Sequence, residues 1–347
     1  MGPVSEAKCS SGRRTPPWLG TVLVSAFSLG CLLYVYHDFN WREELPKLAR
    51  IHWAWIALAA ACDVLVYVSQ AWRWNILLRP VARLPLWRSV QAIYIGMFAN
   101  EVLPLRSGEL IRCYLITVWD RIPFPKVLSS ALIERLIDGV WLILGFAVTT
   151  MFLDLPNEIG AGVWILTALV ALIGSLVAFA VLDRRFARHV TTRHRWAEPL
   201  RMIVEGLHEM GRARTFILAV GASTVYLWLQ VVPIHAMLAG YGLDLGLGAS
   251  AVVLVVLRLG TIVPAAPGNV GLFHVCGYLA LHKVLGVDAQ TAKMVTGVMF
   301  FVITVPLLIA GALAVALTGT EIREIYHRAH SQPRTQAASS AERPVAD

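Results

Sequence analysis

Residues 294–318 read MVTGVMFFVITVPLLIAGALAVALT, with no Asp, Glu, Lys or Arg among them. A second uncharged run extends from Ala161 to Leu182. About 20 apolar residues in a helix cross a hydrocarbon core roughly 30 Å thick, so each run predicts a transmembrane helix. Across the 347 residues, 57% are hydrophobic and only 15% are charged, whereas a soluble domain has roughly a quarter charged residues. The chain is therefore predicted to be an integral membrane protein.

Six stretches predict spanning helices: 18–36, 53–78, 128–152, 161–182, 215–236 and 294–318. Two further apolar stretches, 89–116 and 249–285, are interrupted by Pro, Gly and charged residues. Residues 1–17 form a polar leading segment, and residues 319–347 form a polar tail whose composition predicts disorder. The first apolar run is long, and it is followed by His37, Asp38 and Phe39 rather than by a small-residue cleavage site. We therefore expect an uncleaved first helix rather than a signal peptide.

The charges of the connecting segments predict the orientation. Eight arginines lie between residues 183 and 214, and three more lie between 79 and 88. The segments 153–160 and 237–248 contain acidic residues but no Lys or Arg. Because Lys and Arg collect in cytoplasmic loops, we expect both termini in the cytoplasm, at a prokaryotic cytoplasmic membrane. The same rule is a sufficient explanation for the net charge of +8, so no nucleic-acid partner is expected.

The six spanning helices already place every connecting segment on the side of the membrane that its charge predicts. The stretch 89–116 must then enter and leave from the cytoplasm, and 249–285 from the outside. We therefore predict an all-α polytopic domain over residues 18–318, with six spanning helices and two oppositely oriented re-entrant helical hairpins related by an inverted repeat. Eight ordinary crossings by kinked helices are the alternative.

Residues 196–211 have apolar side chains at helical spacing and charged side chains mainly on the other face. This pattern predicts an interfacial helix on the inner leaflet. A short soluble connecting helix is the alternative.

The first interrupted stretch reads NEVLPLRSGELIR from Asn100 to Arg112. Pro104 and Gly108 are expected to turn the chain, and charged side chains at membrane depth need a partner or a ligand. Arg106 and Arg112 are candidate phosphate-binding groups, because a guanidinium can bind a phosphate through two hydrogen bonds. Glu109 would hold one arginine in place. A structural ion pair between Glu109 and an arginine is the alternative.

The second interrupted stretch reads RLGTIVPAAPGNVGLFH from Arg258 to His274. Its turn residues are Pro264, Pro267, Gly268 and Gly271. A second half-helix is expected to begin near Asn269, with its N-terminus directed at the turn and ready for an anion. Arg258 needs an acidic or phosphate partner. His274 either is buried and hydrogen-bonded or handles protons.

Between the two stretches, Glu134 and Asp138 are four residues apart and share one helix face, with Arg135 beside them. The carboxylates on this face either balance the charge of Arg106, Arg112 or Arg258, or form a proton-coupling site. A structural salt bridge is equally compatible with the spacing. Arg73, inside a predicted span, is expected to pair or to snorkel.

The three motifs N-x-x-L-P-x-R-x-G-E-x-x-R, E-R-x-x-D and P-x-x-P-G-x-x-G occur in this order. Over residues 50–318 the chain resembles the transmembrane region of lysylphosphatidylglycerol synthetases, which defines a group of flippase-like membrane proteins. The resemblance implies movement of lipids with charged or glycosylated headgroups between leaflets. It also implies signature roles for Asn100, Pro104, Arg106, Gly108, Glu109, Arg112, Glu134, Arg135, Asp138, Pro264, Pro267, Gly268 and Gly271.

Two features depart from that family. Its aminoacylating members carry a large soluble catalytic domain after the membrane part, whereas only a short polar segment follows Gly319 here. We therefore do not expect this chain to make lysyl-lipid. His274 also stands where the family commonly has a carboxylate after the Pro-Gly turn.

Three functions fit these features. The first is a lipid transporter that binds an anionic phospholipid or a polyprenyl-phosphate-linked sugar between the hairpins. The second is a membrane-embedded enzyme of lipid-linked glycan or phospholipid modification, with Glu109, Glu134, Asp138 and His274 as acids and bases. The third is an accessory subunit of a partner lipid-modifying enzyme. The five cysteines are scattered without a C-x-x-C pair, and neither H-E-x-x-H nor a P-loop occurs. We expect no metal, no cofactor and no enzymatic activity.

Overall fold

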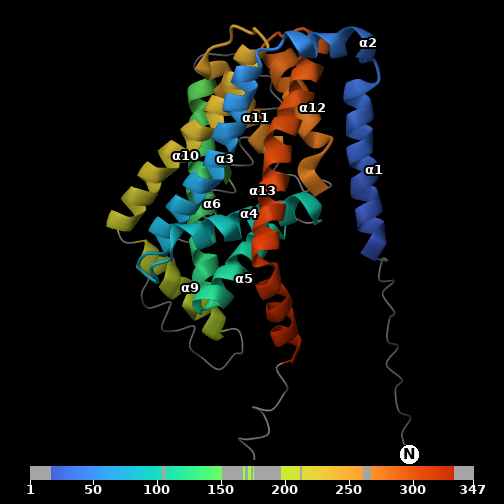
Figure 1. The fold of residues 1–347 in the computed structure, drawn as a ribbon. Coiled ribbons are helices and arrows are strands. Elements are labelled where there is room, and N and C mark those ends of the chain that lie inside the picture. Colours follow the sequence, from blue (N-terminus) through green and yellow to red (C-terminus); the bar gives the residue numbers. More distant parts are fainter. Residues whose placement is uncertain are drawn as a thin grey trace, which may run out of the picture.

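The computed structural model describes residues 17–103, 107–150, 197–211, 213–260 and 267–331, together with 167–168, 171–172 and 175. Within these residues every regular element is a helix (Figure 1). This confirms the expected all-α class. The element bounds are α1 Pro17–Tyr36, α2 Trp41–Glu44, η1 Leu45–Arg50, α3 Trp53–Leu78, α4 Leu86–Val102, α5 Gly108–Asp120, α6 Phe124–Thr150, α9 Ala197–Met210, α10 Ala213–Gly240, α11 Leu247–Gly260, η3 Pro267–Asn269, α12 Leu272–Tyr278, η4 Leu279–Val284 and α13 Ala289–Ser331.

Three helices of the described part are long and apolar enough to cross a membrane. They are Trp53–Leu78, Arg214–Gly240 and Ala289–Gly319, which correspond to three of the six expected spans. The expected span 18–36 coincides with α1, and 128–152 falls mostly within α6. Helix α6 has 27 residues but carries several charged side chains, Lys126, Glu134, Arg135 and Asp138. The expected span 161–182 falls almost entirely outside the described residues.

The first interrupted stretch forms two helices that pack against each other, α4 and α5. Close approach of their backbones requires glycine on both sides. A Cβ at Gly96 would lie 2.7 Å from the carbonyl oxygen of Gly108, and a Cβ at Gly108 would collide with the carbonyl oxygen of Gly96. With 17 and 13 residues, the two helices are roughly 26 and 20 Å long. Each is therefore shorter than a bilayer core.

The second interrupted stretch has the same plan. Helix α11 is followed by η3, α12 and the π-helical turn η4, and α12 packs against α11. The close approach here is between Gly260 and Cys276, because a Cβ at Gly260 would collide with the Cys276 sulfur. Helix α12 begins at Leu272, three residues after the Asn269 start expected from the sequence.

Each interrupted stretch contributes to a separate core. One cluster of buried apolar side chains joins α4 and α5 to α3 and α6, with Trp74, Ile93 and Ile116 fully buried at its centre. The other joins α11 and α12 to α10 and α13 around Leu238, Leu281 and Met299. Figure 1 shows α4 and α5 in the half of the molecule that also holds α9, and α11 and α12 in the half capped by α2. Helices α3 and α10, packed along each other, connect the two halves.

Helix α9 has bounds close to the predicted 196–211. Its buried side chains include Val204, Leu207 and Met210, and the helix packs against α6. The Ser129 hydroxyl donates to the Ile203 carbonyl oxygen at 2.9 Å, and Lys126 pairs with Glu209 at 3.0 Å. The apolar face is thus covered at least in part by protein, and its placement on a leaflet stays a prediction.

Candidate functional site

Five of the sequence-predicted site residues meet at one place, where α3, α5 and α6 come together. They form ion pairs with one another and with Arg73 of α3. We call these residues the charge network: Arg73, Glu109, Arg112, Glu134, Arg135 and Asp138. Arg73 was expected to pair or to snorkel, and the structure shows that it pairs.

Glu134 lies at the centre of the charge network. Its Oε1 atom accepts from Arg73 Nη2 at 2.6 Å and from Gln70 Nε2 at 3.2 Å. Its Oε2 atom accepts from Arg112 Nη2 at 2.7 Å. The side chains of Glu134, Arg73 and Arg112 all have 0% exposure. An unpaired charge in the protein interior has a high free-energy cost, and the two guanidinium groups avoid this cost by pairing with the buried carboxylate.

Arg73 of α3 contacts both α6 and α10. Its Nη1 atom donates to Asp138 Oδ1 at 2.5 Å and to Ser223 Oγ at 3.2 Å. The guanidinium carbon also lies 4.4 Å from the centre of the Tyr226 ring, which is a cation–π distance. Arg73 therefore fixes the relative positions of three helices, α3, α6 and α10.

The network becomes more exposed toward Arg135. Arg112 Nη2 also donates to Glu109 Oε2 at 2.8 Å, and Arg135 pairs with Glu109 and, at 3.6 Å, with Asp138. The exposed fractions of Glu109, Asp138 and Arg135 are 29%, 23% and 46%. The network thus extends from a fully buried core to an accessible rim.

The network contains three arginines and three carboxylates, yet its hydrogen bonding is incomplete. Among the described residues, Arg112 Nε, Arg112 Nη1 and Arg73 Nε have no acceptor, although all three atoms are buried. The Arg112 guanidinium lies 4.8 Å from the centre of the Trp74 ring, and the Trp74 Nε1 atom donates to Ser130 at 2.7 Å. A buried donor without a partner costs about 1–3 kcal/mol. An acceptor brought by a ligand would offset that cost.

The turn of the first interrupted stretch is stabilised by Asn100. Its Oδ1 atom accepts from the Gly108 backbone N–H at 2.8 Å, which supplies an acceptor to the start of α5. Glu109 follows in the first turn of α5, where a negative charge is favourable. Pro104 and Arg106, two of the predicted site residues, lie outside the described residues.

The second interrupted stretch turns through left-handed backbone. The φ angles of Gly268, Asn269 and Gly271 are 72°, 49° and 86°, a region that side chains with a Cβ rarely adopt. Pro267 lies in η3, whereas Pro264 lies outside the described residues. Arg258 of α11 donates a hydrogen bond to Gln230 of α10.

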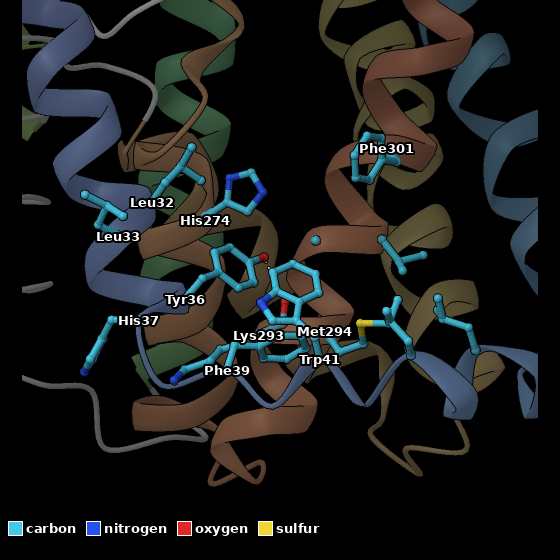
Figure 2. A pocket seen from close by; sticks show the side chains of 14 residues that line it. Leu32, Leu33, Tyr36, His37, Phe39, Trp41, His274, Lys293, Met294 and Phe301 are labelled. Carbon is cyan, nitrogen blue, oxygen red and sulfur yellow. Dashed lines mark hydrogen bonds between the residues drawn. The ribbon is translucent and has the colours of Figure 1, made fainter. Parts of the chain in front are cut away.

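His274 lies away from the charge network, in a pocket of about 480 Å³ between α1, the α2–η1 segment, α12 and α13. Its ring centre is 5.6 Å from that of Tyr36 and 4.9 Å from that of Phe300. Figure 2 shows His274 and Tyr36 inside the pocket, with Leu32 and Leu33 of α1 on one side and Phe301 of α13 on the other. The remaining lining residues are His37, Phe39, Trp41, Leu45, Leu48, Lys293, Met294, Gly297 and Val298.

The sequence did not predict several polar groups that contact the charge network or line the pocket around His274. Gln70, Ser223 and Tyr226 contact the charge network, and Tyr36 and Lys293 line the pocket. The signal for Gln70 was its spacing from Arg73, which places both near one face of α3. In the described part of the chain, no group of three or more His, Cys, Asp or Glu residues is arranged to hold a metal ion.

The sequence matches known proteins along most of its length. The profile of the lysylphosphatidylglycerol synthase TM region matches residues 18–311. The chain is 26% identical over 264 residues to "Glycosyltransferase AglD" of Haloferax volcanii, which covers 63% of this chain and 42% of that protein. It is 21% identical over 279 residues to a "UPF0104 membrane protein" of Methanothermobacter thermautotrophicus, which covers 72% of this chain and 80% of that one. Only part of the first relative is therefore represented here.

Proposed function

The chain belongs to the family of the lysylphosphatidylglycerol synthase TM region, and on this basis we propose that it moves a lipid between the two leaflets of a membrane. The lipid carries an anionic or glycosylated headgroup, which binds at the charge network while the hydrocarbon chains stay in the bilayer. As a multi-pass membrane protein of this family, the chain has the spanning helices that such a role needs.

The observation that carries the proposal is the incomplete hydrogen bonding of Arg112. Glu109 and Glu134 occupy one of its nitrogens, Nη2, and they hold the guanidinium in place. Nε and Nη1 have no acceptor among the described residues. These two donors point in different directions, because the Cδ atom lies between them, so each can donate a separate hydrogen bond to an oxygen of a headgroup. We propose that Arg112 binds a headgroup phosphate oxygen through these unpaired donors.

The arrangement of the helices supports a transporter. We propose that α4 with α5 and α11 with α12 are re-entrant hairpins entering from opposite faces, related by an inverted repeat. The helices of each pair are individually shorter than a bilayer core, and each pair belongs to its own core. Substrate sites in transporters with such repeats lie near the midplane, where half-helices end. The basic segment 79–88 lies in the half that holds α9, and the start of α1 and the end of α13 point toward that same end of the molecule (Figure 1). This favours a cytoplasmic position for both termini.

A second candidate follows from the relative in Haloferax volcanii, which is described as a glycosyltransferase. The match covers less than half of that protein. We propose as the alternative that this chain serves as a membrane-embedded enzyme, or as an accessory subunit of one, in lipid-linked glycan or phospholipid modification. Glu109 and Asp138 at the accessible rim of the charge network are the acid–base groups that this alternative would use.

The experiment is lipid exposure in liposomes containing the purified chain. The probes are fluorescent phospholipids with phosphatidylglycerol and phosphatidylcholine headgroups, and a membrane-impermeant quencher reports the fraction that changes leaflet. We expect the wild type to exchange the anionic probe faster than empty liposomes, and Arg112→Gln to lose most of that rate. Arg88→Gln is the matched control, because Arg88 pairs with Asp120 at 2.6 Å on the surface with 48% exposure.

The result that would contradict transport is a wild-type rate equal to that of empty liposomes for every headgroup. A change in the headgroup mass of the recovered lipid would instead support the enzyme. Arg112→Lys keeps the positive charge but lacks the planar guanidinium with its several fixed donors, so we expect it to recover little of the lost rate. Gel filtration of each variant shows whether it remains folded.

A further inference from the structure

The pocket between α1 and α13 has an almost entirely apolar wall. Leucines of α1 and η1, the aromatic residues Phe39 and Trp41, and Met294, Val298 and Phe301 of α13 line it. Gly297 lies on the inner face of α13, where a Cβ would come within 3.0 Å of the Tyr36 hydroxyl. The volume of about 480 Å³ falls in the range of ligand pockets.

Part of the pocket rim is exposed apolar surface. Two of its lining residues, Leu33 of α1 and Phe301 of α13, are 60% and 64% exposed. The same two helices carry further exposed large apolar side chains, among them Phe27, Leu29, Val305 and Ile309. In a spanning helix such a surface faces hydrocarbon. A molecule that enters the pocket from the side therefore comes from the lipid phase.

A single buried cation lies at one end of this apolar space, among the described lining residues. The Lys293 side chain is only 3% exposed, and its ammonium group pairs with Asp38, whose side chain is 56% exposed. The Lys293 ammonium also lies 5.5 Å from the centre of the Tyr278 ring, and the Tyr36 hydroxyl donates to the Lys293 carbonyl oxygen at 3.1 Å. The buried Nδ1 atom of His274, another lining residue, has no partner in the described part of the chain.

The two partners of this ion pair differ in how easily they can be replaced. Lys293 is fixed by its surroundings, whereas Asp38 lies in the solvent-exposed turn after α1 and faces water. An anion of another molecule can take the place of Asp38 at little cost, because the Asp38 carboxylate can be solvated instead. The molecule that carries this anionic group would also need an apolar part to fill the rest of the pocket.

We propose that the pocket between α1 and α13 binds one hydrocarbon chain of an anionic lipid, whose phosphate exchanges with Asp38 at the Lys293 ammonium. The site is separate from the charge network, and it needs no transport to be occupied. It accepts the lipid on the side of the molecule that carries α2, whereas α9 lies at the other end (Figure 1). His274 Nδ1 is available as a further polar contact for the headgroup.

The experiment is photo-cross-linking of the full chain in vesicles. The probes are phosphatidylglycerol and phosphatidylcholine with a diazirine in one acyl chain, and peptide mass spectrometry locates the label. We expect phosphatidylglycerol to label the peptides that contain Leu33, Met294 or Phe301 several-fold more than phosphatidylcholine does. Lys293→Gln should reduce the phosphatidylglycerol signal about tenfold, the effect of losing one charge-assisted hydrogen bond.

Two further variants separate lipid binding from a structural ion pair. Asp38→Asn removes the competing carboxylate and should raise the labelling by phosphatidylglycerol, whereas a purely structural pair predicts that Asp38→Asn and Lys293→Gln lower it equally. Gly297→Leu should fill the pocket and abolish labelling. Gly221→Leu is the matched control on α10, where nothing lies within 4 Å of an added Cβ, and it should label like the wild type.

Labelling that is equal for the two headgroups, unchanged in Lys293→Gln, or lowered in Asp38→Asn would overturn the proposal. Free glycerol phosphate added in excess distinguishes a lipid site from a phosphate site. We expect it to leave the labelling intact, and competition by it would count against the lipid. Loss of transport in the liposome assay leaves these outcomes unchanged, because the label reports occupancy alone.

Discussion

At the scale of single residues, Glu134 determines how the buried charges are arranged. Each of its two carboxylate oxygens accepts a hydrogen bond from a different arginine, Arg73 of α3 and Arg112 of α5. One side chain of α6 therefore neutralises cations from two other helices. Removing one partner of a buried ion pair leaves the other charge uncompensated, which costs far more than the pair itself contributes.

We therefore expect Glu134→Ala to lower the free energy of unfolding by about 3–5 kcal/mol. Glu205→Ala is the matched control, because Glu205 pairs with Arg201 on the surface of α9 with 39% exposure, and such a pair contributes less than about 1 kcal/mol. Tryptophan fluorescence of detergent-solubilised protein during denaturation measures both. Equal losses in the two variants would show that Glu134 does not hold the network together.

Asn100 supplies a second prediction at this scale. Asn100→Ala removes the acceptor of the Gly108 N–H, so that a buried donor is left unpaired at a cost of about 1–3 kcal/mol. The start of α5 should then open more often, and hydrogen exchange of the amides in residues 108–111 should become faster. Gln91→Ala on the same helix, α4, is expected to leave their exchange unchanged.

The charge network could be predicted in part from the sequence. The spacing of Glu134 and Asp138 places them on one face of α6, and Glu109 with Arg112 is an i, i+3 pair in α5. The partner of Arg73 could not be predicted, because Glu134 is 61 residues away and periodicity does not say which helices pack together. Lys293 was missed for a similar reason, since its contacts Tyr36 and Asp38 lie 257 and 255 residues away in the sequence.

At the scale of elements, the structure depends on close approaches between helices. Gly96 and Gly108 bring α4 and α5 together, and Gly260 allows α11 to approach α12. The sequence predicted both interrupted stretches, because Pro and Gly break apolar runs at these places. It did not predict the glycine contacts, since a glycine at a packing contact and a glycine on an open face look the same in the sequence.

Gly108→Ala and Gly221→Ala should therefore change stability in opposite directions. A Cβ at Gly108 collides with the Gly96 carbonyl oxygen, so α4 and α5 must separate and the melting temperature should fall. A Cβ at Gly221 meets nothing within 4 Å, and replacing glycine by alanine inside a helix contributes about 1 kcal/mol. Thermal unfolding in one detergent compares the two. A fall of equal size at Gly221 would contradict this account of the hairpin.

At the scale of the whole molecule, α1 is attached to the other helices at few places. Its main packing partner is α12, where Gly271 meets the Ser28 backbone. The turn that follows α1 is joined to the start of α13 by the pair of Asp38 with Lys293 and by the hydrogen bond from Gln290 to the Asp38 carbonyl oxygen at 3.0 Å. The position of α1 thus depends on a charged contact at one end of the helix.

This contact makes the position of α1 dependent on pH. The hydrogen bond from Lys293 lowers the pKa of Asp38 below its ordinary value of 3.8. A carboxyl group with a lowered pKa stabilises the folded state above its unfolded pKa and loses that effect as the pH falls through the folded pKa. Wild type should therefore melt above Asp38→Asn at pH 7, and the difference should begin to shrink as the pH falls below about 3.8 and disappear below the lowered pKa of the folded state.

The measurement is the melting temperature of the two proteins in detergent between pH 7 and pH 3. Asp244→Asn is the control, because Asp244 is exposed in the turn after α10. It should match the wild type at every pH in this range. A difference between wild type and Asp38→Asn that is as large at pH 3 as at pH 7 would show that the aspartate acts without its charge.

The equal numbers of arginines and carboxylates in the charge network have a consequence for the electrical energy of transport. One elementary charge that moves through a membrane potential gains or loses about 2.3 kcal/mol per 100 mV. The six formal charges of the network cancel, so a rigid displacement of the network along the field does no net work. In a transport cycle through this site, the voltage would act on the headgroup alone. A lipid with one negative charge would carry current, and a zwitterionic lipid would cross without any.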